Sequence, residues 1–136
     1  MKIAICGSMS FAKEMLEVQV SLEELGHTAI APVDAEKYAN GESLIDDKWT
    51  KIKNDVIKEW YKVIKDSDAV LVVNQNKNNI ENYVGGNALI EMAFAHILDK
   101  KKFLLNPIPE DMNYTDEIES FQPTVLNGDL NKINAN

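Results

Sequence analysis

The sequence predicts an α/β protein built on a parallel sheet of five strands with helices on both faces. Short apolar segments alternate with helical segments along almost the whole chain of 136 residues. The apolar segments are continuous runs, which is typical of strands that are covered on both faces. Because crossovers between parallel strands are right-handed, this order of elements leaves few possible topologies.

Five segments are expected to form the strands of this sheet. Each is short and apolar, and most end at a glycine, a proline or a polar loop. They cover residues 2–6, 28–31, 69–74, 102–106 and 123–126. Strands separated by helices in this way fit a flavodoxin-like doubly wound sheet with the strand order 2-1-3-4-5. In such a sheet, ligands bind beyond the carboxyl ends of strands 1 and 3.

Four segments have the spacing or the composition of helices. They cover residues 11–25, 49–65, 85–98 and 115–120. In the first of them, Met15, Val18 and Leu22 share one face, which indicates packing on a core. Residues 34–47 are polar and irregular and predict a surface lid, and the polar tail 131–136 is expected to fray.

The charge and composition exclude several classes of partner. A net charge of −8 argues against DNA, RNA or an anionic membrane, although backbone amides can still hold a single phosphate. The one cysteine, Cys6, forms no disulfide within the chain, which fits a reducing cytoplasm. We see neither a signal-peptide pattern nor an apolar run long enough to span a membrane. We therefore expect a single cytoplasmic domain over residues 1–136.

Glu91 is the most informative residue of the sequence. Every residue of the segment 88–98 is apolar except Glu91 and His96, so the segment predicts a buried helix, which Gly85 and Gly86 open. Burying an ionised carboxylate costs free energy or raises its pKa. Glu91 lies about one turn inside the helix, which makes it the best candidate for a nucleophile or general base. The alternative is a glutamate that binds the backbone amides of a neighbouring loop.

Other candidate substrate-binding residues are expected to gather near Glu91 at the carboxyl edge of the sheet. They follow the first, third and fourth strands or begin the helix of Glu91. They are Gly7, Ser8, Met9, Ser10, Asn74, Asn106, Gly85, Gly86 and Asn87. The amides and hydroxyls of the two glycine-containing turns suit an anion or a sugar hydroxyl. The alternative for Ser8 and Ser10 is an ordinary helix N-cap, because the first turn has neither a P-loop nor a dinucleotide-binding pattern.

A carboxylate held above two amide-rich turns suits attack on a sugar C1, where an oxocarbenium-like charge develops. Retaining glycosyl transfer of this kind usually needs a second group that protonates the leaving base. Glu59, Asp55 and Tyr83 are candidates, and the alternative for each is a solvated surface residue.

The remaining ionisable residues have simpler explanations. His27 is expected at the surface and His96 as a buried or half-buried imidazole. Two isolated histidines and one cysteine have no metal-ligand spacing, so neither a metal nor a cofactor is expected. Lys77 lies in the polar loop beside the expected pocket, where it either contacts a phosphate or is solvated. Asp68 begins the third strand and should therefore lie at the opposite edge of the sheet.

Together these residues resemble the nucleoside 2-deoxyribosyltransferase superfamily, which includes the deoxynucleoside 5′-monophosphate N-glycosidases. The segments that carry the resemblance are residues 5–9, 68–73, 86–91 and 102–107. The resemblance implies that Glu91 is the nucleophile that forms a covalent glycosyl-enzyme ester. It also implies that the turn of Gly7, Ser8 and Met9 binds the sugar or its 5′ group. Finally, it implies a homodimer or larger assembly, in which residues 116–123 contribute to the neighbouring pocket.

Two positions depart from the pattern of this superfamily. The superfamily has a tyrosine on the first strand that orients the nucleophile, whereas this chain has Ala4 and Ile5 there. It also has an aspartate that donates a proton, on the helix before the third strand. In this chain Trp60 takes that place, with Glu59 beside it. Glu59 is therefore the expected second catalytic residue.

Three hypotheses for function remain. The first is cleavage or transfer of the N-glycosidic bond of a (deoxy)nucleoside or its 5′-monophosphate through a glycosyl-Glu91 intermediate. The second is a non-catalytic module that binds or senses nucleotides. The third is a phosphoribohydrolase-like enzyme, although the Gly-Thr and the arginine typical of that group are absent. All 14 basic residues are lysines, so no guanidinium can clamp a phosphate, and a free nucleoside is the favoured substrate.

Overall fold

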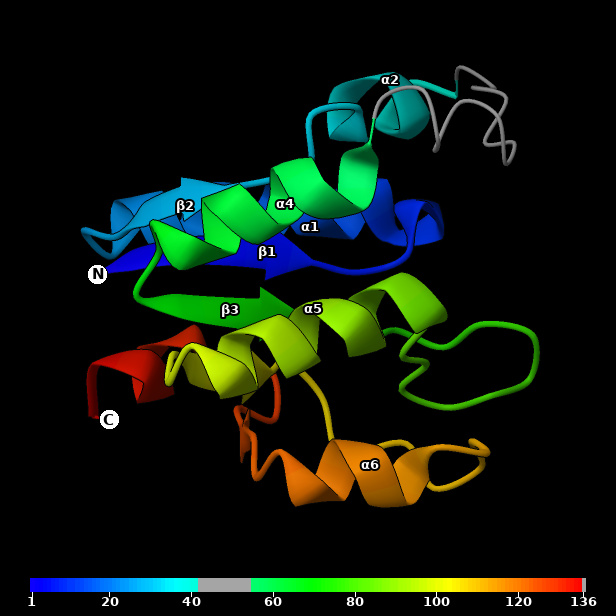
Figure 1. Cartoon of the computed structure of the whole chain (residues 1–136). Helices are drawn as coiled ribbons and strands as arrows, with labels where there is room; N and C mark the ends of the chain where they lie inside the picture. The colour runs from blue at the N-terminus through cyan, green and yellow to red at the C-terminus, as the bar shows by residue number, and fades with distance from the viewer. Residues whose placement is uncertain (42–54, 136) are drawn as a thin grey trace.

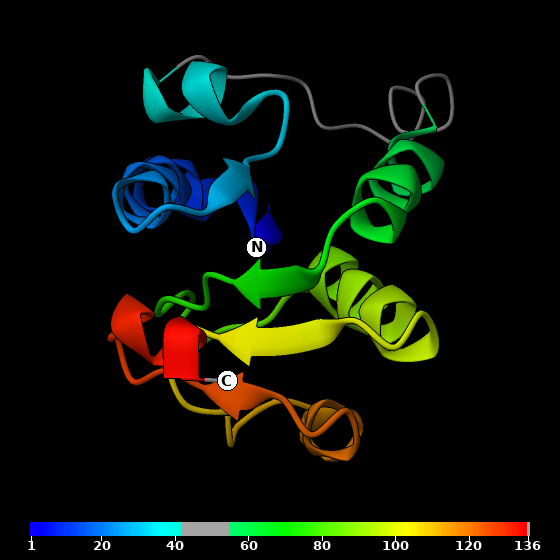
Figure 2. The same ribbon diagram turned by 90° about the vertical axis from the view of Figure 1, so that its left-hand side faces the viewer.

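A single all-parallel sheet organises the structure, a computed structural model that describes residues 1–41 and 55–135. Five strands form this sheet in the order β2-β1-β3-β4-β5. The fold class and the strand order predicted from the sequence are therefore confirmed. Figures 1 and 2 show the sheet with helices on both of its faces.

The strands are short and mostly apolar. They are β1 (Lys2–Cys6), β2 (Thr28–Ile30), β3 (Ala69–Val72), β4 (Lys101–Leu104) and β5 (Thr124–Val125). In the central pair, Ile3 of β1 lies opposite Ala69 of β3, and Cys6 lies opposite Val72. The carboxyl ends of these strands therefore meet at one edge of the sheet, which is where the sequence places the candidate site.

Helices of different length cover the two faces of the sheet. They are η1 (Met9–Phe11), α1 (Ala12–Glu24), α2 (Ala35–Ala39), α4 (Val56–Lys65), α5 (Gly86–Ile97), α6 (Thr115–Ser120) and η2 (Leu130–Ala135). Figure 2 shows α4, α5 and α6 on one face, and α1 and η2 on the other. Each face has its own core of buried side chains. Because alternate residues of a strand point to opposite faces, Ile3 and Ile5 belong to the α1 side, and Ala4 and Cys6 belong to the α5 side.

Several predictions about helices and ends need correction. α2 forms within the segment 34–47, which the sequence predicts to be irregular, and residues 42–47 of that segment lie outside the described residues. Residues 49–54 of the predicted helix 49–65 also lie outside them. The described part of the tail is not frayed as predicted. It forms η2, because Ile133 is fully buried in the core on the α1 side.

The prediction that α5 is buried all round is wrong. Ile90 and Ile97 are 37% and 76% exposed, because α5 belongs to the outer layer and only one of its faces can contact the sheet. Ala88, Met92 and Ala95 form that inner face. Among the residues that the structure describes, no helix combines the length and the apolarity that crossing a membrane requires.

Candidate active site

Glu91 lies in the second turn of α5, which begins at Gly86 with Gly85 as its N-cap, as predicted. The helix packs on β3, β4 and α4, and its first turn lies at the carboxyl edge of the sheet. The Glu91 side chain is partly buried and lies near the thiol of Cys6 at the end of β1. Within the described residues, Glu91 takes part in no ion pair. The carboxylate is therefore not held in a salt bridge with any described residue.

The surroundings of Glu91 favour its neutral form. Burial raises the pKa of this carboxyl group from 4.5 to about 7, and the nearby Cys6 thiol opposes part of that rise. The side chain therefore exists as carboxylate and as carboxylic acid in comparable amounts near pH 7. A perturbed carboxyl group at the ligand-binding edge of a sheet is characteristic of a functional site.

Cys6 lies between Glu91 and Trp60. The thiol is 1% exposed, and its burial together with the nearby Glu91 charge raises its pKa. It therefore stays protonated and is a core thiol, not a nucleophile. The indole N–H of Trp60 is buried without a hydrogen-bond partner among the described residues.

The turn after β1 approaches β3 so closely that only glycine fits at position 7. A Cβ atom on Gly7 would lie 3.0 Å from the carbonyl oxygen of Val73. Ser8 then caps the following 3-10 helix, since its Oγ accepts a hydrogen bond from the amide of Ser10 at 3.3 Å. Met9 packs against the core on the α1 side, and Ser10 is exposed. The N-cap interpretation of Ser8 is therefore confirmed, but it does not exclude a ligand.

Lys77 lies beside the turn after β1, and the sequence left open whether it contacts a ligand or is solvated. Its Nζ donates to Ser8 Oγ at 3.0 Å and lies 5.2 Å from the centre of the Tyr83 ring. The loop that carries it is compact, with Asn78, Asn79 and other residues at positive φ, a conformation that asparagine tolerates. An asparagine-rich loop signals such turns, but it does not show where the lysine points. The structure brings a cation to the turn after β1.

Asn74 and Asn106 have a structural role at the same edge. The buried Asn74 amide donates to the carbonyl oxygens of Asn106 and Pro107, at 3.0 Å each. In return, the backbone amide and the side chain of Asn106 donate to Asn74 at 2.9 and 3.0 Å. β3 ends at Val72 and β4 at Leu104, and beyond these ends the side chains of Asn74 and Asn106 connect the two segments. We therefore leave Asn74 and Asn106 out of the proposed substrate contacts.

The start of α5 presents Gly86 and Asn87 to solvent. Gly85 lies against Tyr83, because a Cβ atom on Gly85 would be 3.3 Å from the tyrosine ring. Tyr83 is therefore the one of the three candidate proton donors that adjoins the helix of Glu91. Asp55 instead pairs with Lys58 at the surface.

Glu59, the predicted second catalytic residue, lies at the surface of α4. Its carboxylate is 65% exposed and pairs with Lys62 at 3.2 Å on the outer side of α4. Trp60, one position further along the helix, turns inward instead and packs with Cys6. Neighbouring positions of a helix point in different directions, which is why Glu59 faces solvent while Trp60 faces the core.

Two histidine predictions are also wrong. His27 is buried, and its ring lies 3.0 Å from the N-terminal amine of Met1. The backbone amide of Thr28 donates a hydrogen bond to the carbonyl oxygen of Met1, which holds the two segments together. His96 is exposed on the outer side of α5, where its ring lies 3.2 Å from Lys102 Nζ. Asp68 accepts a hydrogen bond from the Lys2 amide at the opposite edge of the sheet, as expected.

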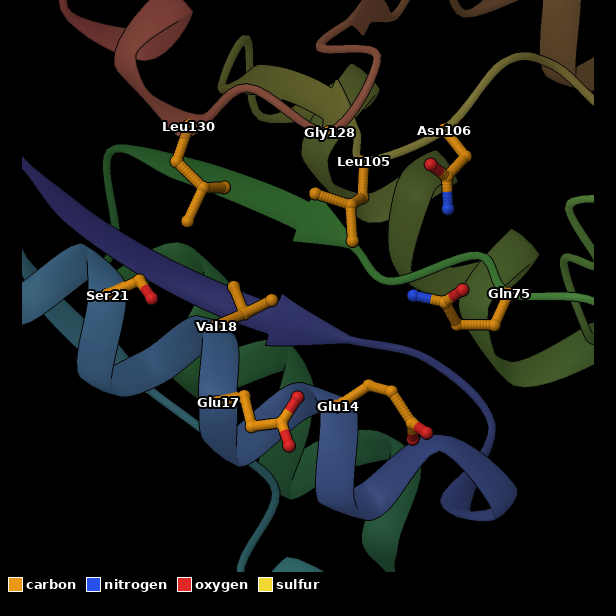
Figure 3. A pocket seen from close by; sticks show the side chains of 9 residues that line it. All are labelled: Glu14, Glu17, Val18, Ser21, Gln75, Leu105, Asn106, Gly128 and Leu130. Carbon is orange, nitrogen blue, oxygen red and sulfur yellow. The ribbon is translucent and has the colours of Figure 1, made fainter.

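A pocket of about 290 Å³ opens on the α1 side of the sheet, as Figure 3 shows. Its lining consists of Glu14, Glu17, Val18, Ser21, Gln75, Leu105, Asn106, Gly128 and Leu130. One carboxylate oxygen of Glu14 is buried without a partner among the described residues. Two carboxylates repel a phosphate, so this pocket does not suit a phosphate group. It is also separate from Glu91, which lies on the α5 side of the sheet.

The fold and the site define a flavodoxin-like α/β domain with a half-buried carboxylate at the ligand-binding edge. The structure is similar to a solved structure of a 2-deoxyribosyltransferase from Bacillus psychrosaccharolyticus. The TM-score is 0.56 and the sequence identity is 22%, over 83% of this chain and 77% of that chain. No family model matches the sequence, and no curated protein is similar enough to match it. This similarity shows that the two proteins share a fold.

Proposed function

We propose that the protein cleaves or transfers the N-glycosidic bond of a (deoxy)nucleoside or its 5′-monophosphate through a covalent ester on Glu91. The observation that carries this proposal is the position of Glu91. It is a partly buried carboxyl group with a pKa raised to about 7, and it lies at the carboxyl edge of a fold shared with a 2-deoxyribosyltransferase. A structural glutamate would be expected in an ion pair or at the surface, where its pKa is ordinary.

The proposed reaction has two steps at the sugar C1′. The carboxylate of Glu91 attacks C1′ as the bond from C1′ to the base nitrogen breaks, and the base leaves with the electron pair. Water or a second base then attacks C1′ and releases the carboxylate. The leaving base needs a proton, which the indole of Trp60 cannot supply. We propose Tyr83 for this task, because its ring lies beside Gly85 at the start of α5.

The 5′ group of the substrate is proposed to bind at the turn of Ser8. Lys77 Nζ lies 3.0 Å from Ser8 Oγ, so the turn offers a cation together with a hydroxyl group. A cation at hydrogen-bond distance favours a phosphate far more than a neutral hydroxyl. Although the chain has no arginine, this contact makes the 5′-monophosphate the preferred form of the substrate.

Replacing Lys77 by methionine tests the 5′ group. The KM for a deoxynucleoside 5′-monophosphate is expected to rise about tenfold, since one charge-assisted hydrogen bond is lost. The KM for the free deoxynucleoside should stay unchanged. Lys13→Met, at an exposed position of α1, is the matched control. An equal rise in KM for both substrates would show that Lys77 supports the turn and does not bind phosphate.

An assembly of identical subunits is part of the proposal. Large apolar side chains are exposed on neighbouring helices, and they are Val56, Ile57, Ile90 and Ile97. α4 and α5 pack against each other on the same face of the sheet. A second copy of the chain that covers this surface would remove it from water. Residues 116–123, which include most of α6 on the same face of the sheet, remain the proposed contribution to a neighbouring pocket.

The experiment that tests the function is base release from a panel of substrates. The protein is incubated with deoxynucleosides and their 5′-monophosphates, with and without an acceptor base, and free base is followed by chromatography. Release that disappears in Glu91→Ala supports the proposal. Saturable binding without release in any mixture would support the nucleotide-binding module instead.

A further inference from the structure

A β-hairpin of residues 75–83 follows β3 and carries Lys77. Figure 1 shows this segment as the loop between β3 and α5. The amide of Lys77 donates to the carbonyl oxygen of Ile80 at 3.0 Å, and the amide of Ile80 donates back to the carbonyl oxygen of Lys77 at 2.9 Å. Asn78 and Asn79 lie between them, with φ of 53° and 63°. A two-residue hairpin loop with positive φ at both positions is a type I′ turn.

Further hydrogen bonds close the hairpin below this turn. The amide of Asn82 donates to the side-chain oxygen of Asn76 at 3.0 Å. The amide of Tyr83 donates to the carbonyl oxygen of Gln75 at 2.8 Å. The side-chain amide of the buried Asn74 reaches the carbonyl oxygen of Asn82 at 3.4 Å, which connects the base of the hairpin to the end of β3. The backbone of the hairpin is thus held at its tip, its middle and its base.

We infer that this hairpin is a specificity element for 5′-phosphorylated substrates, in which the turn residues Asn78 and Asn79 are positioning residues for Lys77. This inference rests on the proposed function. The hairpin places Lys77 Nζ 3.0 Å from Ser8 Oγ, where the 5′ group is proposed to bind. A flexible loop would lose conformational entropy on binding a phosphate, whereas a loop that is already ordered keeps that part of the binding energy.

The turn residues act through the backbone and not through their side chains. Asn78 and Asn79 are both exposed, and neither side chain makes a hydrogen bond with a described residue. Asparagine tolerates positive φ better than most residues, and glycine adopts it without strain. Alanine has a Cβ atom and no polar group that could compensate, so it disfavours this conformation. The residue types at the turn therefore determine how completely the hairpin forms.

The same hairpin carries Tyr83, the proposed proton donor. Lys77 Nζ lies 5.2 Å from the centre of the Tyr83 ring, and that ring lies against Gly85. The backbone of Tyr83 is held at the base of the hairpin by its bond to Gln75, whereas the backbone of Lys77 is held at the tip by its pairing with Ile80. A weaker turn should therefore release Lys77 and leave Tyr83 in place. Such a change affects binding of the phosphate and not the chemical step.

A matched pair of substitutions at Asn79 tests this inference. Asn79→Ala and Asn79→Gly remove the same side chain, but only alanine disfavours the positive φ of the turn. In Asn79→Ala, the KM for a deoxynucleoside 5′-monophosphate should rise about threefold, with kcat and the KM for the free deoxynucleoside unchanged. Asn79→Gly should keep the wild-type KM for both substrates, because Asn-Gly is the preferred sequence of a type I′ turn.

Three results would overturn the inference. The first is a wild-type KM for the monophosphate in Asn79→Ala. The second is an equal rise in both variants, which would show that the Asn79 side chain itself contacts the substrate. The third is an additional rise when Asn79→Ala is combined with Lys77→Met. The turn is inferred to act only through Lys77, so the double variant should match Lys77→Met alone.

Equilibrium binding separates this inference from the proposed function. Calorimetric titrations with the deoxynucleosides and their 5′-monophosphates use Glu91→Gln protein, in which turnover should not consume the ligand. Monophosphate binding that is weakened about threefold by Asn79→Ala and not by Asn79→Gly supports the inference even if wild type releases no base, in which case only the proposed function fails. Equal binding by both variants, in a protein whose base release requires Glu91, overturns the inference alone. A protein that binds no monophosphate also overturns it.

Discussion

Replacing Glu91 by glutamine is expected to lower the rate of base release at least about a thousandfold and to leave the fold intact. The amide is nearly isosteric with the carboxylic acid, but it has no ionised oxygen to attack C1′. Burying a neutral amide is also easier than burying a carboxylate. Single-turnover assays of free base, together with circular dichroism and thermal unfolding, measure both effects on the same sample.

Glu23→Gln is the matched control for this experiment. Glu23 is an exposed carboxylate on α1, so its replacement should change neither turnover nor stability. Turnover that survives in Glu91→Gln at a tenth or more of the wild-type rate would show that another group forms or replaces the ester. Loss of turnover with loss of the native circular dichroism spectrum would not count as support, and Glu91→Asp would then separate folding from chemistry.

The same substitution is expected to change how stability depends on pH. The carboxyl group of Glu91 has a pKa of about 7 in the folded protein and about 4.5 when unfolded. Below pH 4.5 it is protonated in both states, so its contribution to stability is fully present. Between pH 4.5 and 7 the folded state keeps the proton and the unfolded state releases it, so stability is lost as the pH rises. The loss amounts to roughly 3 kcal/mol by pH 8.

Glu91→Gln cannot titrate at this position and should avoid the loss. The free energy of unfolding of the variant, relative to wild type, is therefore expected to increase by up to about 3 kcal/mol between pH 4.5 and 8. Urea unfolding at pH 4.5, 6 and 8 measures this difference. If the free energies of unfolding of variant and wild type differed by the same amount at all three pH values, the pKa of Glu91 would be ordinary. Glu91 would then not be the perturbed carboxylate that the proposed function requires.

The same ionised carboxylate that is expected to be needed for base release is expected to lower the stability of the folded protein. A protein that keeps a partly buried carboxylate near pH 7 folds less stably than one with glutamine at the same position. Such a cost is typical of sites where a charged group must meet a ligand in a dry environment. The pH profile of base release should then rise through about pH 7, where stability falls, because only the ionised Glu91 can attack.

The fold and the position of Glu91 could be predicted because both depend on local patterns. Continuous apolar runs separated by helices define a parallel sheet, and Gly85 and Gly86 mark the helix start that carries Glu91. The contact between Cys6 and Glu91 could not be predicted in the same way. Because side chains alternate between the faces of a strand, the sequence of β1 places Cys6 and Ala4 on one face. Only the tertiary structure shows that the part of α5 near Glu91 covers this face beside Cys6.

The errors also have physical reasons. Apolar residues such as Ile97 predict burial, yet periodicity cannot distinguish a side chain in the core from one that is exposed on an outer helix. His27 follows a glycine in a turn, which suggests the surface, but the amine of Met1, just before β1, contacts its ring. Lys77 belongs to a loop whose course depends on several residues at positive φ, so its contact with Ser8 is a tertiary property.

The measurement that tests the central claim most directly is the capture of the glycosyl ester. The protein is mixed with a 2-fluoro-2-deoxyarabinosyl nucleoside or its 5′-monophosphate, whose fluorine slows both steps, and is quenched and analysed by peptide mass spectrometry. We predict an added fluorodeoxyarabinosyl group (or its 5′-phosphate) on the peptide that contains Glu91, at the carboxylate of that residue. Release of base with the added mass on another residue, or with no covalent species at all, would contradict the account.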